Sequence, residues 1–207
     1  MEPKYSILLC NQSLDEYRGK IAAWLSKGIK VLWFGKNEEQ EELKRDHVDF
    51  SKAFLLQAYV TSLEDVGVLI DGEGDRNLFI KLAEDCKLFN SAQYEVEHCK
   101  SDEHIVVQAS AGTGNTTVMI DRIMYLLHTI PDLRLSEMFM ITFTNDAAQQ
   151  MSNRLQDAFM TRYTLTKQKR YMRWVEEQSQ MHISTIHSFA YYMLKQLGIG
   201  ESFTKGL

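Results

Sequence analysis

The segment from residue 105 to residue 127 constrains the fold of this chain more than any other part of its sequence. An apolar run at 105–107 precedes a glycine-rich stretch, Gln-Ala-Ser-Ala-Gly-Thr-Gly-Asn-Thr-Thr at 108–117, and an amphipathic run follows at 118–127. A strand, a glycine-rich turn and a helix in this order can bind phosphate, because the turn and the helix N-terminus direct backbone N–H groups toward the anion. The segment therefore predicts an α/β fold with a phosphate-binding loop.

The loop departs from the usual pattern, which ends in Gly-Lys-Ser/Thr. Asn115 stands at the lysine position, so the loop lacks the positive charge that normally contacts the β- and γ-phosphates. Thr116 stands where a hydroxyl would hold Mg²⁺. A glycine-rich turn between a strand and a helix can also be purely structural, and this segment alone leaves both interpretations open.

Composition limits the class of protein. The 207 residues are 44% hydrophobic, which is enough to form one large domain or two small ones. The net charge of −5 argues against a surface coated with basic charge. Cys10, Cys86 and Cys99 form no C-x-x-C pair, which indicates reduced thiols in a cytoplasmic protein rather than disulfides or a zinc site. No signal-peptide pattern or membrane-length apolar run is present, so we expect no membrane partner.

Apolar periodicity predicts alternating strands and helices. In the first part we expect strands near 6–10, 29–34, 54–60 and 66–70, a helix opened by a capping box from Ser13 to Glu16, and helices at 38–45 and 77–86. These elements predict a small accessory α/β domain over residues 1–86, with parallel strands joined by helices. Over residues 87–207 we expect helices at 116–128, 146–161 and 189–197 and strands at 138–143 and 183–184, in a parallel sheet that binds ligands at its strand C-termini.

Four short segments in the second part occur in a specific order. They are residues 89–93 (Phe-Asn-Ser-Ala-Gln), the loop at 108–117, residues 141–148 (Ile-Thr-Phe-Thr-Asn-Asp-Ala-Ala) and residues 183–189 (Ile-Ser-Thr-Ile-His-Ser-Phe). This series resembles the opening of the first motor domain of UvrD/Rep-type superfamily 1 DNA helicases, and the loop is most similar to that of their RecB/AddA-like relatives. The resemblance covers about residues 88–198 and implies a parallel-sheet P-loop NTPase (RecA-like) partial motor domain, preceded by the small α/β domain.

The resemblance implies a site for ATP and Mg²⁺. Gln93 matches the family's adenine-pairing glutamine, whose amide offers both donors and an acceptor. Without the loop that follows it, Gln93 would be interpreted as a polar helix residue. The phosphate-binding positions would be Ala111, Gly112, Thr113, Gly114, Asn115, Thr116 and Thr117, with Thr116 on Mg²⁺.

The resemblance also implies contacts with single-stranded DNA, through Phe143, Asn145, His187 and Ser188. An aromatic ring can stack on a base, and polar groups can hold phosphates. Phe143 could instead be a core residue and Asn145 a helix N-cap. Asp146 departs from the family, which often has lysine there, and its carboxylate would repel phosphate.

A basic stretch rich in aromatics lies between the last two motifs, and it suits either single-stranded DNA or a solvent-facing helical insertion. Its residues are Tyr163, Lys167, Lys169, Arg170, Tyr171, Arg173 and Trp174.

The resemblance implies ATP-driven translocation on single-stranded DNA, with the remaining helicase domains as partners in the intact protein. No acidic Asp-Glu motif follows Phe189. We therefore expect an N-terminal fragment, truncated before the acidic Mg²⁺-binding motif, that does not hydrolyse ATP at a motor-like rate by itself. The alternative is a non-catalytic nucleotide-binding or protein-interaction module with a degenerate phosphate loop.

Overall fold

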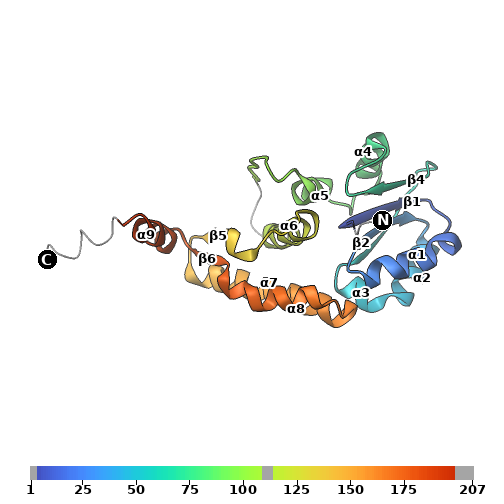
Figure 1. The fold of residues 1–207 in the computed structure, drawn as a ribbon. Coiled ribbons are helices and arrows are strands. Elements are labelled where there is room, and N and C mark those ends of the chain that lie inside the picture. The colour runs from blue at the N-terminus through green and yellow to red at the C-terminus, as the bar shows by residue number, and fades with distance from the viewer. Residues whose placement is uncertain (1–3, 109–113, 199–207) are drawn as a thin grey trace. The chain divides into compact units, whose positions relative to one another are not determined.

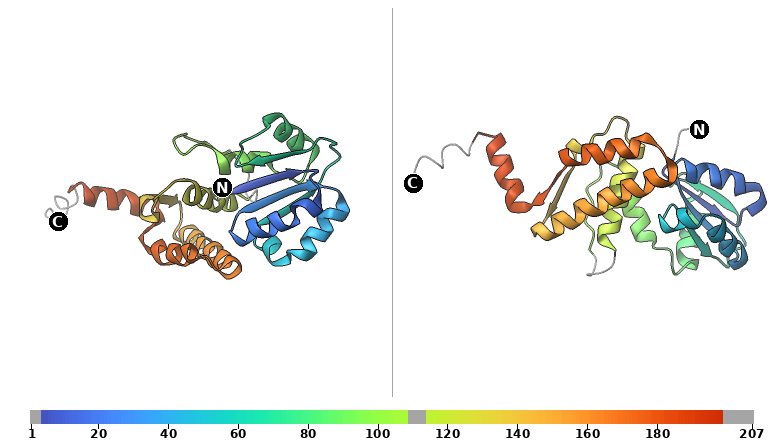
Figure 2. Two further views of the ribbon diagram at one scale, coloured as in Figure 1. Left: turned by 45° about the vertical axis from the view of Figure 1, so that its right-hand side comes forward. Right: turned by 90° about the horizontal axis from the view of Figure 1, so that it is seen from below.

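The computed structural model describes residues 4–108 and 114–198, which form two compact units. The first unit comprises Met1–Pro131 and Thr161–Gln168, and the second comprises Asp132–Met160 and Lys169–Leu207. Figure 1 labels the elements, and Figure 2 gives two further views. The sequence-based division of the chain after residue 86 stays a prediction.

A four-stranded sheet forms the centre of the first unit. Its strands are β1 (Ser6–Cys10), β2 (Lys30–Gly35), β3 (Leu56–Val60) and β4 (Gly67–Ile70), in the order β3-β2-β1-β4. β1, β2 and β3 are parallel, as predicted, but β4 runs antiparallel to β1. The expectation of an all-parallel layer was wrong here, because residues 61–66 join β3 to β4 without the dozen or more residues that a parallel crossover needs.

Helices cover both faces of this sheet. Alternate residues of β1 point to opposite faces, so that Ile7 and Leu9 belong to one hydrophobic core and Leu8 and Cys10 to the other. The first core includes residues of α1 (Leu14–Ser26) and α2 (Asn37–Asp46), and Phe50 of α3 (Val48–Lys52) packs against it; Figure 1 shows these three helices on one side of the sheet. The second core includes residues of α4 (Arg76–Asp85) and α5 (Ser91–His98).

The start of α1 differs in detail from the prediction. The helix begins directly after Ser13, but the Ser13 side chain makes no capping hydrogen bond, so the predicted capping box does not form. The helix is held instead by its apolar side, since Leu14, Ile21 and Leu25 are buried.

Residues 105–107 do not form the predicted strand before the phosphate loop. They have no regular secondary structure, and Val106 is 94% exposed. A strand needs a neighbouring strand to accept and donate its backbone hydrogen bonds. No described strand pairs with this run, so its apolar character does not produce a strand here. The helix that follows, α6 (Asn115–Thr129), forms as predicted.

The second unit contains a small parallel sheet and helices. Its elements are η1 (Leu135–Glu137), β5 (Phe139–Thr142), most of α7 (Asn145–Thr166), α8 (Lys169–Glu177), η2 (Gln178–Gln180), β6 (His182–Thr185) and α9 (Ile186–Gln196). β5 and β6 pair in parallel, which confirms the predicted relation between these strands. Thr142 lies opposite Thr185, so both strands end at the same edge.

The basic stretch comprises the end of α7, a break at residues 167–168 and the start of α8, and aromatic side chains of α8 are buried. Tyr171 and Trp174 of α8 are buried, and Trp174 packs at 5.7 Å, ring centre to ring centre, against Phe159 of α7. The rings of Tyr171 and Trp174 therefore belong to the core and cannot stack on DNA bases, which favours the interpretation as a helical insertion. In the parts of the chain that the structure describes, no helix is both long enough and apolar enough to span a bilayer.

Candidate nucleotide and nucleic-acid sites

Gln93 lies beside Gly114, the glycine that ends the predicted phosphate loop. The Asn90 side chain caps α5 by accepting a hydrogen bond from the Gln93 backbone N–H at 3.0 Å, which fixes Gln93 in the first turn. Gly114 is the N-cap of α6 and has a φ of +87°, a conformation that favours glycine. A Cβ at position 114 would lie 3.0 Å from Gln93 Nε2, which shows how closely the end of the Gln93 side chain approaches this glycine.

Arg122 of α6 holds α5 and α6 together. Its guanidinium donates to the carbonyl of Glu97 at 2.9 Å, to that of Lys100 at 3.0 Å and to that of Cys99, at the C-terminal end of α5. These donors satisfy carbonyls that a helix end leaves unpaired. The pairing of α5 with α6 therefore keeps the predicted adenine residue next to the predicted phosphate loop.

A pocket of about 300 Å³ opens where α5 and α6 face the sheet of the first unit. Gln93, Gly114 and Thr117 line it on one side, and Lys30 and Tyr59 of the sheet line it on the other. The pocket brings together two of the predicted sequence motifs. It also includes sheet residues that sequence reasoning missed, because their strands carry no recognisable motif.

Four charged side chains form a buried cluster at this pocket. Lys30 Nζ lies 3.2 Å from Glu97 Oε2 and 3.9 Å from Asp121 Oδ2, and Arg162 Nη2 lies 3.8 Å from Asp121 Oδ1. Burial raises the pKa of the Asp121 carboxyl, and the nearby Lys30 opposes that rise. The cluster joins β2, α5, α6 and the end of α7.

The phosphate-loop positions are only partly described. Ala111, Gly112 and Thr113 lie outside the described residues. Asn115 and Thr117 are exposed in the first turn of α6, and Thr116 is half-buried. No group of three His, Cys, Asp or Glu side chains arranged for a metal occurs among the described residues.

The predicted DNA residues occupy two neighbouring corners of the second unit. Phe143 follows the end of β5, and His187 and Ser188 follow the end of β6. Phe143 is 92% exposed, which excludes the core interpretation, and Asn145, His187 and Ser188 are exposed as well. Because Thr142 and Thr185 are register partners, the four residues lie at the same end of the sheet, where both strands finish, as the parallel arrangement predicts.

Threonines, and not Asn145, cap the helices at these corners. Thr144 Oγ1 accepts a hydrogen bond from the Ala147 N–H at 3.1 Å, and Thr185 Oγ1 accepts one from the Ser188 N–H at 3.2 Å. The Asn145 side chain is therefore not needed as the N-cap, and its amide is available at the surface. Asp146 is also exposed, in the first turn of α7.

A polar pocket of about 370 Å³ lies at the same edge. Asn145 and Ser188 line it together with further uncharged polar residues, Gln149, Ser152, Gln178, Ser179, Ser184 and Thr185. Most of these come from α7 and from the segment before β6. Ser184 and Thr185 belong to the predicted motif at 183–189, whereas sequence reasoning missed Gln149, Ser152, Gln178 and Ser179, because serine and glutamine at helix surfaces carry no distinguishing spacing.

The comparisons with known proteins match the second part of the chain. Residues 89–203, more than half of the 207, match the UvrD/REP helicase N-terminal domain. A protein of Ligilactobacillus salivarius that is named as one of the subunits of an ATP-dependent helicase/nuclease is 30% identical over 98 residues, which cover 45% of this chain and 8% of that protein. The protein of the same name from Clostridium kluyveri is 32% identical over 94 residues, 44% of this chain and 8% of its own length.

A third relative carries a different name. The RecB protein of the RecBCD enzyme of Borreliella burgdorferi is 30% identical over 112 residues, 53% of this chain and 10% of that protein. The matched segments thus span a tenth or less of these relatives. The family match, which covers residues 89–203, shows that the chain belongs to the UvrD/REP helicase N-terminal domain family.

Proposed function

We propose that this chain is the first-motor-domain portion of an ATP-dependent UvrD/Rep-type DNA helicase or translocase. In this proposal the first unit binds ATP with Mg²⁺, and the second binds single-stranded DNA. The observation that supports the proposal is the close approach of the Gln93 amide, which could pair with adenine, to Gly114 at the end of the predicted phosphate loop. The names of the relatives, which denote a helicase/nuclease and a RecB protein, agree with it.

ATP binding would use the loop and the N-terminus of α6. Backbone N–H groups of the first helical turn and the helix dipole would hold the phosphates, and Thr116 would supply a hydroxyl to Mg²⁺. Gly114 leaves the space that the Gln93 amide occupies. The geometry of the described residues therefore fits a nucleotide, although Asn115 brings no positive charge.

DNA binding would use the edge at which β5 and β6 end. Phe143 presents an exposed ring for stacking on a base, and Asn145, His187 and Ser188 present donors for phosphates. This recognition is tolerant of sequence, because every base has an aromatic face and every nucleotide a phosphate.

The test is the binding of a fluorescent oligothymidylate to the purified chain. Phe143→Ala should weaken binding by about 1–3 kcal/mol, whereas Phe143→Trp should retain it. Lys44→Ala, on α2 of the first unit, is the control and should leave affinity unchanged. Affinity should also fall with added salt. Equal binding by the Phe143→Ala variant and the wild type would refute the proposed DNA interface.

One observation favours a second function. Asn115 at the lysine position is what a nucleotide-binding or protein-interaction module that has lost catalysis would show. The two functions differ in turnover. DNA-stimulated ATP hydrolysis on the order of 1 s⁻¹ by the purified chain would exclude the non-catalytic module.

A further inference from the structure

The pocket beside Gln93 has a second wall, which comes from the N-terminal sheet. Leu32 on β2 and Gln57 and Tyr59 on β3 line the same 300 Å³ space as Gln93 and Gly114. All of them belong to the first unit. The family match begins at residue 89, so this wall comes from a part of the chain that the family model does not include.

The Gln57 amide is oriented by its neighbour. Tyr59 Oη donates a hydrogen bond to Gln57 Oε1 at 3.0 Å, which leaves the two Nε2 hydrogens of Gln57 as its donors. Burial raises the pKa of Tyr59 to about 12, so the phenol keeps the proton that it donates. The half-buried Gln57, which lines the pocket, therefore has its amide oriented by Tyr59 and keeps its N–H groups as donors.

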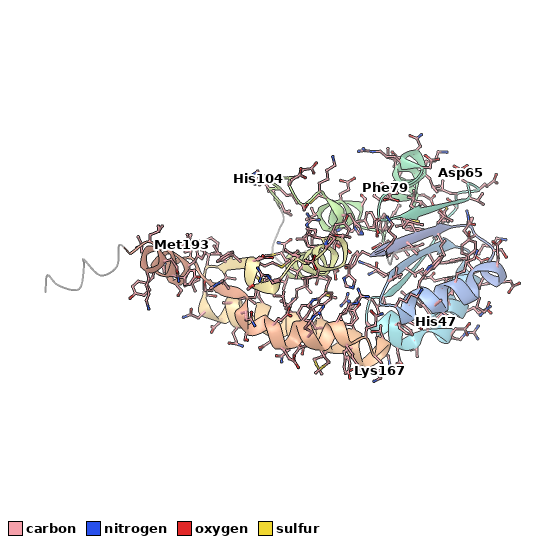
Figure 3. All side chains as sticks on the ribbon, viewed as in Figure 1. His47, Asp65, Phe79, His104, Lys167 and Met193 are labelled. Carbon is pink, nitrogen blue, oxygen red and sulfur yellow. The ribbon has the colours of Figure 1, made fainter. Side chains whose placement is uncertain are left out.

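The Tyr59 ring is itself held in place. It stacks on Phe34 with ring centres 5.0 Å apart and planes 17° apart, and it meets Phe89 edge-on at 5.5 Å. Phe89 in turn packs against Phe79 of α4, labelled in Figure 3, at 6.0 Å. The wall is thus a packed aromatic surface with a fixed amide, which suits a flat heteroaromatic ligand.

The charges at the pocket indicate which part of a nucleotide enters it. Glu97 and Asp121 line the pocket together with Lys30, and Lys30 and Arg162 balance their two charges, so the cluster offers phosphate groups no uncompensated positive charge. Carboxylates can accept hydrogen bonds from ribose hydroxyls, and amide N–H groups can donate to the ring nitrogens of a purine. The pocket therefore fits the nucleoside, with the phosphates directed toward the N-terminus of α6.

We propose that Gln57 and Tyr59 make the N-terminal sheet a specificity-determining wall of the nucleotide site, with the Gln57 amide donating to a ring nitrogen of the purine. Tyr59 acts as a positioning residue through its hydrogen bond to Gln57. This inference rests on the proposed ATP site. It assigns the accessory part of the chain a role in choosing the nucleotide.

The experiment measures the binding of ATP and of adenosine to the full chain by calorimetry. Adenosine lacks phosphates and so isolates the base and ribose contacts. Gln57→Leu removes the donors and should weaken both ligands about three- to tenfold. Gln57→Glu keeps an acceptor for the Tyr59 hydroxyl but replaces the donors by an acceptor, and should weaken both at least as much. Tyr59→Phe releases the amide and should have a smaller effect in the same direction.

The matched control is Gln40→Leu. Gln40 of α2 donates to the carbonyl of Ala58, on the same strand, at 2.7 Å and does not line the pocket. Its loss should lower the melting temperature without changing either affinity. If both Gln57 variants bind with unchanged affinity while Gln93→Leu binds more weakly, the proposed role of Gln57 and Tyr59 is refuted and the proposed ATP site is not. A wild-type chain that binds neither ligand would overturn both.

Discussion

Removing the Lys30 ammonium should destabilise the first unit more than any surface substitution. In Lys30→Met the apolar stem is retained, but Glu97 loses a partner at 3.2 Å and Asp121 one at 3.9 Å. The Lys30 and Glu97 side chains are only 7% and 5% exposed, so water cannot replace the lost contact. In the unfolded chain water solvates the same carboxylates fully, so the substitution raises the free energy of the folded state alone.

The size of the loss follows from this geometry. Two unit charges about 3.2 Å apart attract by about 5 kcal/mol at an effective dielectric constant of ~20. Breaking a buried pair by removing one partner typically costs about 3–5 kcal/mol. Arg162, 3.8 Å from Asp121, continues to compensate that carboxylate. We therefore expect Lys30→Met to lower the free energy of unfolding by about 3 kcal/mol, and the double variant Lys30→Met/Glu97→Gln to lose clearly less, because it leaves no unpaired Glu97 charge.

The assay is urea unfolding followed by tryptophan fluorescence. Trp33 is fully buried in the first unit and Trp174 lies in the second, so a Trp174→Phe background confines the signal to the first unit. All four members of the double-mutant cycle are compared at pH 7 in this background. A loss below about 1 kcal/mol in Lys30→Met, or a double variant as unstable as the single one, would refute the reasoning.

Three further outcomes are expected. Asn115→Lys should strengthen Mg²⁺-ATP binding by roughly 1–2 kcal/mol, about tenfold or somewhat more, because a charge-assisted hydrogen bond replaces a neutral one. Equal affinities of the two forms in calorimetric titrations would show that the loop is only structural. Burial lowers the pKa of His98 to about 3. Its folded-state pKa lies below the unfolded value of about 6.5, so its contribution to stability is complete above that pH and is lost as the pH falls toward 3, by about 1.4 kcal/mol per pH unit. Urea unfolding between pH 4.5 and 7.5 should therefore give a shallower pH dependence for His98→Gln than for the wild type, and parallel curves would contradict this. Asp146→Lys should strengthen the binding of single-stranded DNA and steepen its dependence on salt, because it replaces an exposed carboxylate by an ammonium. An unchanged salt dependence in fluorescence titrations would mean that residue 146 lies outside the interface.

Local structure could be predicted from the sequence because its determinants are local. The strands β1 and β2 and the helix α6 lie within a residue or two of the predicted ranges, since continuous apolar runs mark strands that are buried on both faces and helical apolar spacing marks the buried side of α6. The antiparallel direction of β4 could not be read in this way. Periodicity within one strand contains no information on which neighbour it pairs with or in which direction.

The candidate sites show the same limit. The motif residues Gln93 and Gly114 were identifiable because each carries a distinctive pattern, and the structure brings them together. Gln57 and Tyr59 were not, because only the folded sheet places them at the pocket. Residues 105–107 illustrate the converse, since an apolar run forms a strand only where a partner strand is present.

The paired strands β5 and β6 also have a consequence for handling this protein in solution. In the part of the second unit that the structure describes, each strand pairs only with the other, so each keeps one outer row of backbone N–H and C=O groups without a strand partner. Phe139 and Ile141 on β5 are 49% and 43% exposed. Such an edge is a template for strands of other molecules, so concentrated preparations should aggregate, and affinities should be measured at the lowest workable protein concentration.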